Sequence, residues 1–166
     1  MFYFRIIYEV KIMTKKTPSD SYTEQVQIVS QADLNGFSRL FGGRLMQWID
    51  IVAAVCARRH CECNVITAMV DKLEFHAAAY ANDIILLTAK VTYTGKTSME
   101  VCVESYVEKS NGKRLLINRA FFIMVAMDKN EVPASVPQLD PQTPKERLAW
   151  EEGFKRYLAR REKSHS

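Results

Sequence analysis

The residues best suited to chemistry lie between Asn35 and Asp50. Two adjacent glycines, Gly42 and Gly43, lead directly into an amphipathic helix that carries a carboxylate, Asp50, two turns further on. Paired glycines let backbone amides come close to a ligand, and a helix N-terminus offers unpaired N–H donors with a partial positive charge. Such donors suit a carbonyl oxygen that becomes negative during a reaction. The pattern predicts a site where the amides and the carboxylate flank one substrate.

This helix is predicted from Gly43 to about His60. At 100° per residue, one stripe is apolar and consists of Leu45, Trp48, Ile49, Val52 and Cys56. A second face is made mostly of small residues and consists of Met46, Asp50, Ala53, Ala54 and Ala57. A solvated face would carry Lys and Glu. We therefore expect another chain or segment to pack closely there, with Asp50 at the seam.

The helix needs a sheet to cover it. A first strand is predicted at Ser21–Ser30, a shorter one at Val65–Phe75, and long ones at Asp83–Thr94, Ser98–Glu108 and Leu115–Met127. On Ser98–Glu108, valines alternate with glutamates, which predicts one buried and one wet face. A last helix opens at Thr143, whose capping box is completed by Glu146, and runs to about Arg161. The order predicts an α+β fold, with an antiparallel sheet wrapped around one long helix.

Composition narrows the functional classes. The 166 residues fit one domain, and the net charge of +4 is too weak to indicate nucleic-acid binding. No apolar run reaches the ~18 residues of a membrane span. The four cysteines lack zinc spacing, so we expect no metal site, and free thiols indicate a reducing compartment. Residues 1–13 make a poor signal peptide, and residues 14–20 are typical of a flexible terminus.

A family resemblance emerges from four motifs taken together. The segment Phe41–Asp50, with Asn35 eight residues before Gly43, resembles the signature of hotdog-fold acyl-CoA thioesterases, in the branch of the cytosolic acyl-CoA hydrolases. Three further segments are similar and stand in the expected order: Val70–Phe75, Gly95–Glu100 and Val136-Pro137. The resemblance covers about Gln25 to Pro137.

The resemblance implies a hotdog fold and the hydrolysis of acyl-CoA thioesters to free fatty acid and coenzyme A. It divides the chain into a flexible N-terminal extension (1–20), a hotdog domain (21–137) and a C-terminal helical extension (138–166). No cofactor is implied beyond the coenzyme A of the substrate. Relatives of this kind are cytoplasmic and form dimers that assemble further, often as a trimer of dimers, with each site built from two chains.

The resemblance also assigns roles. Asp50 is the expected general base or nucleophile, Asn35 the catalytic asparagine from the partner chain, and the Gly43 amide the oxyanion donor. Expected substrate contacts are Phe41, Gly42, Thr67 and, near the coenzyme A nucleotide, Gly95, Lys96, Thr97 and Ser98. Two departures stand out. Ala78 replaces a usual proline, and Asn82 replaces a usual glycine, although asparagine tolerates positive φ and should keep the turn.

Several alternatives stay open. From spacing alone, Asp50 is better read as a structural carboxylate paired with Arg58 or Lys72, and Asn35-Gly36 as a simple turn. The fold could also serve as a non-catalytic acyl-CoA-binding module. A P-loop at Gly95 is excluded, because Lys90 stands where that motif needs a glycine. Histidines 60 and 76 are expected in solvent or loops, and the basic last helix is expected to be solvated, with contact to coenzyme A phosphates by Arg156, Arg160 or Arg161 as a minority interpretation.

Overall fold

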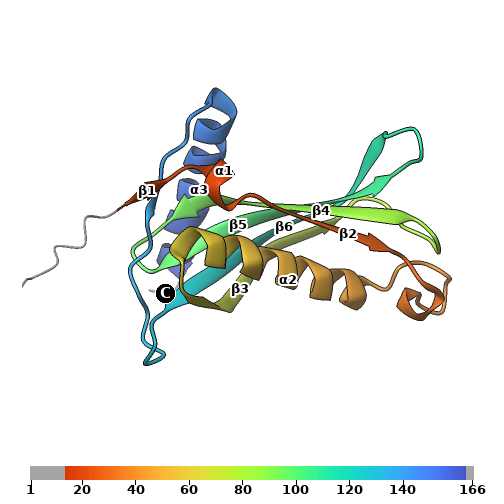
Figure 1. The fold of residues 1–166 in the computed structure, drawn as a ribbon, viewed down its shortest axis with the longest axis horizontal. Helices are drawn as coiled ribbons and strands as arrows, with labels where there is room; N and C mark the ends of the chain where they lie inside the picture. Colours follow the sequence, from red (N-terminus) through yellow and green to blue (C-terminus); the bar gives the residue numbers. More distant parts are fainter. Residues whose placement is uncertain (1–13, 164–166) are drawn as a thin grey trace, which may run out of the picture.

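The computed structural model describes residues 14–163. Its centre is one long helix, α2 (Gly42–Cys61), which lies along a five-stranded antiparallel sheet (Figure 1). The strand order is β2-β4-β5-β6-β3. The strands are β2 (Thr23–Ile28), β3 (Asn64–Phe75), β4 (Ile84–Thr94), β5 (Ser98–Glu108) and β6 (Arg114–Met127). This confirms the predicted hotdog-type α+β layout, although β3, at 12 residues, is longer than expected.

Three turns set the register of the sheet. Between β4 and β5, the Gly95 amide donates to the Ser98 carbonyl at 2.8 Å. Between β5 and β6, Gly112 has φ of 79°, which favours glycine. Asn82 has φ of 67°, so the asparagine keeps the turn that enters β4, as predicted.

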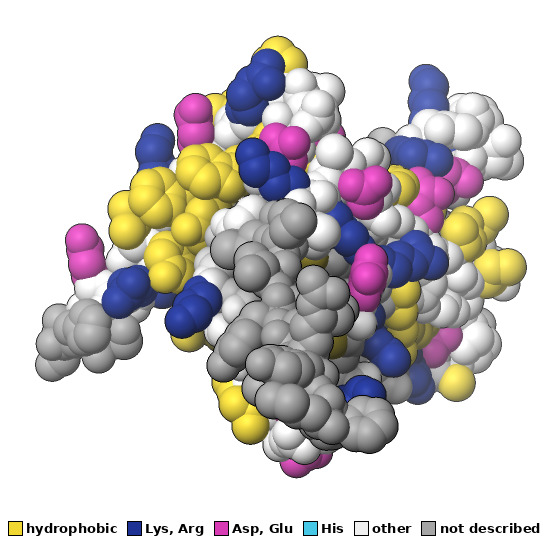
Figure 2. Space-filling view, turned by 60° about the vertical axis from the view of Figure 1, so that its left-hand side comes forward, with side chains coloured by type: hydrophobic (Ala, Val, Ile, Leu, Met, Phe, Trp, Pro, Cys, Tyr) yellow, Lys and Arg dark blue, Asp and Glu magenta, His cyan; other side chains and the backbone are white. Residues whose placement is uncertain are grey.

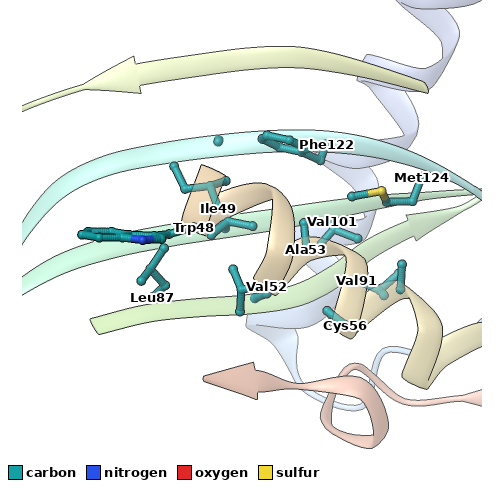
Figure 3. Close-up of a cluster of buried hydrophobic side chains, with 14 of the residues drawn as sticks. Trp48, Ile49, Val52, Ala53, Cys56, Leu87, Val91, Val101, Phe122 and Met124 are labelled. Carbon is teal, nitrogen blue, oxygen red and sulfur yellow. The ribbon is translucent and has the colours of Figure 1, made fainter. Parts of the chain in front are cut away.

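The core lies between α2 and the inner face of the sheet. The predicted apolar stripe of α2 is buried, with Ile49 and Cys56 fully inaccessible. Figure 3 shows these side chains pointing at residues of β4, β5 and β6, among them Leu87, Val101 and Phe122. Ala53 and Ala57 are also fully buried. These alanines therefore pack against the chain's own sheet, and our expectation that this whole face meets another chain is wrong for them.

The outer face of the sheet is covered by α3 (Pro144–Lys163) (Figure 1). The predicted capping box forms, with the Thr143 amide donating to Glu146 Oε2 at 2.9 Å. Glu100 was expected on a wet face but is only 1% exposed, because α3 covers it. Arg156 donates two hydrogen bonds to its carboxylate, at 3.0 and 2.8 Å. The prediction of a solvated last helix is thus wrong for this arginine. Burying the Glu100 carboxylate without a partner would cost free energy, and the ion pair with Arg156 offsets that cost.

The N-terminal end of the described chain meets the segment before α3 beside the C-terminus of α2. The short strand β1 (Lys15–Lys16) pairs with β7 (Gln138–Leu139), and α1 (Pro18–Ser21) follows. Residues 15–20 are therefore folded rather than flexible, because β7 pairs with Lys15 and Lys16 and a capping box between Thr17 and Asp20 closes α1. Residues 1–13 of the predicted extension lie outside the described residues. His60, expected in solvent, is fully buried here, with Nε2 donating to the Pro137 carbonyl at 3.0 Å.

The visible surface is of mixed character. In the view of Figure 2, hydrophobic side chains gather mainly in one patch, while basic and acidic side chains are interspersed over the rest. Mixed signs give no extended field of one sign on this face. Among residues 14–163, no helix is both long and apolar enough to cross a membrane.

Candidate active site at helix α2

A tight loop fixes the N-terminus of α2. The Phe41 amide donates to the Asp33 carbonyl at 2.8 Å, and Arg44 Nε lies 3.0 Å from Asp33 Oδ1. Hydrogen bonds from the Ser30 hydroxyl and amide lower the pKa of the Asp33 carboxyl. Asp33 therefore joins the loop before α2 to the first turn of the helix.

The two glycines begin the helix as predicted. The amides of Arg44 and Leu45 both donate to the Phe41 carbonyl, at 2.9 and 3.1 Å, so the amides of Gly42 and Gly43 precede the first hydrogen bonds of the helix. A Cβ on Gly43 would lie 2.6 Å from Cε1 of Phe41. The exposed Phe41 ring therefore lies over this glycine and would have to move to admit a side chain there.

Asn35 shapes the same loop. Its Oδ1 accepts hydrogen bonds from the amides of Phe37 at 2.9 Å and Arg39 at 3.2 Å. This is the simple turn at Asn35-Gly36 that the sequence alone predicts. Within residues 14–163 both of its side-chain hydrogen bonds use the oxygen, which leaves the amide NH₂ as the end that can donate to a ligand.

Asp50 is held by a partner that sequence reasoning did not supply. The Thr67 hydroxyl donates to Asp50 Oδ1 at 2.6 Å, while Lys72, one of the two expected structural partners beside Arg58, pairs with Glu74 at 2.9 Å. Asp50 is half-buried. Thr67 was predicted as a substrate contact; the structure places it on the carboxylate, and the substrate contact stays a prediction.

A β-bulge positions Thr67. The partners in β6 are Met124 for Thr67 and Ile123 for Met69, which leaves Ala68 as the extra residue on β3. Bulges re-aim side chains and are over-represented next to active sites. No periodicity in the sequence signals such a bulge, which explains why the Thr67–Asp50 contact could not be predicted.

In one chain the predicted catalytic residues form two separate groups. Asn35 and Gly42 line a cavity of about 450 Å³ at the N-terminus of α2, and Asp50 does not line it. Gly43 and Asp50 share one side of the helix, but seven residues at ~1.5 Å rise place them roughly 10 Å apart along its axis. We call Asn35, Gly42 and Gly43 the amide group, and Asp50 with Thr67 the carboxylate group.

The turn Gly95–Ser98 lies at the opposite end of α2 from the amide group (Figure 1). Its carbonyls are used by the chain itself: Lys96 accepts from the Val136 amide at 3.1 Å, and Gly95 from Gln138 Nε2 at 3.2 Å. The Lys96 side chain is exposed. A larger cavity, of about 740 Å³, lies at this end and is lined in part by Cys61 and Val136.

Thiol and metal chemistry find little support. Burial raises the pKa values of Cys56, Cys61 and Cys102 to about 12, so these thiols are poor nucleophiles near neutral pH. Within the described residues, no three His, Cys, Asp or Glu side chains come together as metal ligands. Arg156 and Arg160 contact Glu100 and Asp71 rather than an open site, which counts against the minority interpretation for these two arginines.

Comparison with known sequences places the chain. Residues 37–112 match the thioesterase superfamily. The uncharacterized acyl-CoA thioester hydrolase YkhA of Bacillus subtilis is 34% identical over 137 residues, which cover 79% of this chain and 80% of that protein. The rat cytosolic acyl coenzyme A thioester hydrolase is 36% identical over 148 residues, which cover 86% of this chain. The chain spans only 38% of the length of that rat protein.

Solved structures agree with this placement. A hexameric acyl-CoA thioesterase, solved without ligand, superposes with a TM-score of 0.87 at 34% identity, covering 91% of this chain and 97% of that chain. An asparagine-to-alanine variant of an acyl-CoA hydrolase from Staphylococcus aureus, in complex with coenzyme A, gives a TM-score of 0.88 at 29% identity, covering 92% of each chain. That hydrolase was also studied as single alanine variants of an asparagine, an aspartate and a threonine, spaced 15 and 17 residues apart.

The amide group, the carboxylate group, the sheet that wraps the helix, and the match to YkhA over most of both chains all lead to one assignment. The chain belongs to the acyl-CoA thioester hydrolase family of the thioesterase superfamily.

Proposed function

We propose that this protein hydrolyses acyl-CoA thioesters to a free acid and coenzyme A. The observation that carries the proposal is a shared spacing. Asn35, Asp50 and Thr67 are 15 and 17 residues apart, the spacing of the three residues replaced by alanine in the staphylococcal acyl-CoA hydrolase. In this chain the last two are joined by a 2.6 Å hydrogen bond, so two of the three positions act on one another directly.

The roles follow from what each group can do. The Gly43 amide, at the positive end of the helix dipole, stabilises the oxyanion that forms on the thioester carbonyl. Asp50 takes a proton from the attacking water, or attacks directly to give an anhydride that water then cleaves. Thr67 orients the carboxylate, and the Asn35 NH₂ orients the water or the carbonyl. The C–S bond breaks and coenzyme A leaves with a proton.

Each site must draw on two chains. The oxyanion donor and the base both need to lie within ~3 Å of the reacting atoms, yet Gly43 and Asp50 of one chain are separated by seven helical residues, roughly 10 Å. The amide group of one chain therefore acts with the carboxylate group of its partner. Asn35 serves the same site as Gly43 of its own chain, since it lines the same cavity as Gly42.

The surface around Asp50 suits such a partner. β3 is an edge strand, and an unpaired edge offers backbone groups to a second copy. Its exposed side chains are largely apolar, as are two on the neighbouring turns of α2: Ile51, Val55, Ile66, Met69 and Val70. Because a solved relative is hexameric, we propose dimers through β3 that assemble as a trimer of dimers.

The reducing compartment expected from the sequence fits this proposal. All four cysteines are free thiols, as is usual where disulfides are kept reduced. The rat relative carries the word cytosolic in its name, and we propose a cytoplasmic location for this protein as well.

The first test is thiol release from acyl-CoAs of increasing length by wild type and Asp50→Asn. Loss of the base should lower kcat by about 10²–10⁴-fold, with coenzyme A binding retained. Glu151→Gln, an exposed carboxylate on α3, is the control and should match wild type. Unchanged turnover in Asp50→Asn would contradict the assigned role. Binding by wild type without any thiol release would favour the non-catalytic acyl-CoA-binding module.

A mixed oligomer tests the two-chain site. Asn35→Ala and Asp50→Asn, each inactive alone, are co-expressed with different tags and the mixed dimer is purified. In a two-fold dimer one site then carries both substitutions and the other carries neither, so about half of the wild-type activity should return. Two groups that acted within one chain would give no recovery.

A further inference from the structure

We infer that Cys61 and Cys63 form a redox site, in which thiol–disulfide exchange with a low-molecular-weight disulfide closes a reversible disulfide between them. The pair lies at the C-terminal end of α2, opposite the amide group at the start of the helix. The inference therefore does not rest on the proposed hydrolysis, and it gives the chain a second reactive centre.

The two sulfurs are in direct contact. The Cys63 thiol donates to Cys61 Sγ at 3.0 Å, and the Cys61 thiol donates to the Cys63 carbonyl at 3.6 Å. A disulfide bond is ~2.05 Å long, so the sulfurs need to approach one another by about 1 Å. Cys61 is the last residue of α2 and Cys63 immediately precedes β3. A small adjustment of this short link is therefore enough to close the bond.

The link between α2 and β3 brings the thiols together by contacts of its own. Glu62, the residue between the cysteines, ends the helix in the left-handed conformation, with φ of 55° and ψ of 31°. Its amide donates to the Arg58 carbonyl at 2.8 Å, and its carboxylate pairs with Lys16 at 2.6 Å. The conformation that places one thiol beside the other is thus held by groups outside the pair.

The pair can be reached by a small molecule, unlike the other two thiols. Cys61 and Cys63 are half-buried and line the cavity of about 740 Å³ at this end of α2, a volume usual for small-molecule pockets. Several other lining residues are exposed, so among residues 14–163 the cavity meets the surface. Cys56 and Cys102 do not line it and are 0% and 6% exposed.

The lining also indicates which disulfides fit. Its charged side chains balance in sign: Arg58, Lys129, Glu62 and Asp128. We therefore expect small disulfides to react without a preference for their charge. In the reducing compartment proposed above, the pair rests as two thiols and closes when such disulfides accumulate, as is usual for redox-sensing cysteines in the cytosol.

The exchange proceeds in two balanced steps. Burial raises the pKa of Cys61 to about 12, which leaves the first attack to Cys63. Its thiolate attacks one sulfur of the external disulfide, whose S–S bond breaks as a mixed disulfide forms and the first thiolate leaves. Cys61 then passes its proton to that thiolate and attacks Cys63 Sγ, which releases the second thiol. The protein loses two hydrogens with their electrons, and the external disulfide gains them as two thiols.

The experiment treats the folded protein with glutathione disulfide and follows free thiols and intact mass. Wild type should lose two of its four thiols together with two hydrogens, and peptide mapping should place that loss on the peptide that holds both Cys61 and Cys63. Dithiothreitol should restore the thiols. Cys102→Ala is the control and should form the same link.

Single replacements test the order of the steps. Cys61→Ser should stop after the first step and accumulate a mixed disulfide with glutathione on Cys63. Cys63→Ser leaves only the buried partner of the pair and should react at least about tenfold more slowly. If Cys61→Ser does not fold, the mapping of wild type and the rate of Cys63→Ser decide.

Three results would overturn the inference: stable glutathione adducts on wild type without a link, loss of thiols only after unfolding in urea, and oxidation of Cys56 or Cys102 as fast as the pair. Thiol release from acyl-CoA, measured on the same preparation in its reduced form, keeps the two proposals apart. Protein that closes the link but hydrolyses no acyl-CoA overturns the proposed hydrolysis alone. Active protein that closes no link overturns the redox site alone.

Discussion

Helices α2 and α3 are both 20 residues long and pack on opposite faces of one sheet, yet they are held in different ways. α2 buries an apolar stripe in the core. α3 is held by a ring cluster of Tyr93 with Trp150, Phe154 and Tyr157 and by the ion pair of Arg156 with Glu100. The difference shows which helix can carry a site. Because α2 is held by apolar burial along one stripe, its other side stays free for polar groups such as Asp50.

The charged contacts of α3 extend across the sheet. Arg160 bridges Glu100 on β5 at 3.3 Å and Asp71 on β3 at 2.6 Å, and the Arg156 guanidinium lies 4.0 Å from the centre of the Phe121 ring on β6. Such pairs are directional and costly to break when buried. Arginines that looked available for a ligand are therefore engaged in holding α3 in place.

The largest effect on stability is expected from the core side of α2. Ile49→Ala removes a fully buried side chain and should lower the free energy of unfolding by about 2–5 kcal/mol. Denaturant unfolding measures this. Leu148→Ala on α3, where the side chain is 57% exposed, should change it by under ~0.5 kcal/mol. An equal loss in the free energy of unfolding for the two variants would mean that α2 and α3 do not differ in how much apolar burial holds them.

Breaking the ion pair of α3 should rank next. Arg156→Met leaves Glu100, only 1% exposed, with one weaker cationic partner, and loss of a buried partner costs about 3 kcal/mol. Lys155→Met, an exposed neighbour, serves as the control in the same unfolding experiment. A loss no greater than that of the control would mean that the ring cluster alone holds α3.

A smaller loss of stability is expected where α3 approaches the sheet closely, at Gly153. A Cβ on Gly153 would lie 2.8 Å from the Tyr93 Cβ and 3.0 Å from Glu100 Oε1. Gly153→Ala should therefore cost about 1–3 kcal/mol through overpacking, despite the better helix propensity of alanine. The thermal midpoint reports the change. Gly36→Ala, where nothing lies within 4 Å, is the comparison, and stabilisation by Gly153→Ala would contradict the contact.

The smallest effect concerns pH at the C-terminal end of α2. Burial lowers the pKa of His60 below 6.5, so the unfolded chain binds a proton first as the pH falls. Its contribution to stability is therefore present above pH 6.5 and is lost below it, by at most about 1.4 kcal/mol per pH unit. Unfolding measured from pH 7 to 5 should show this decline, and His60→Gln should flatten it. An equally steep decline in the variant would exclude His60 as its source.

Much of the fold was predictable because its signals are local. The apolar stripe of α2, the turn at Gly112 and the positive φ of Asn82 each follow from residue types at short spacing. Which faces are exposed and which are buried was harder to predict. The alternation on β5 marks two faces correctly, but only the docking of α3 decides that Glu100 is covered. Similarly, His60 is buried because segments distant in the sequence close over it.

The sequence by itself determined the groups on which the proposed chemistry depends: a glycine pair at a helix start, a carboxylate two turns on, and an asparagine before them, all within 16 residues. Helix geometry alone divides these groups, whereas only the tertiary structure decided which side chain holds the carboxylate. The rise of an α-helix keeps Gly43 and Asp50 of one chain roughly 10 Å apart, and a bulge in β3 brings Thr67 onto Asp50. Helix geometry is local, whereas strand register depends on partners far along the chain, and no spacing pattern reports those partners.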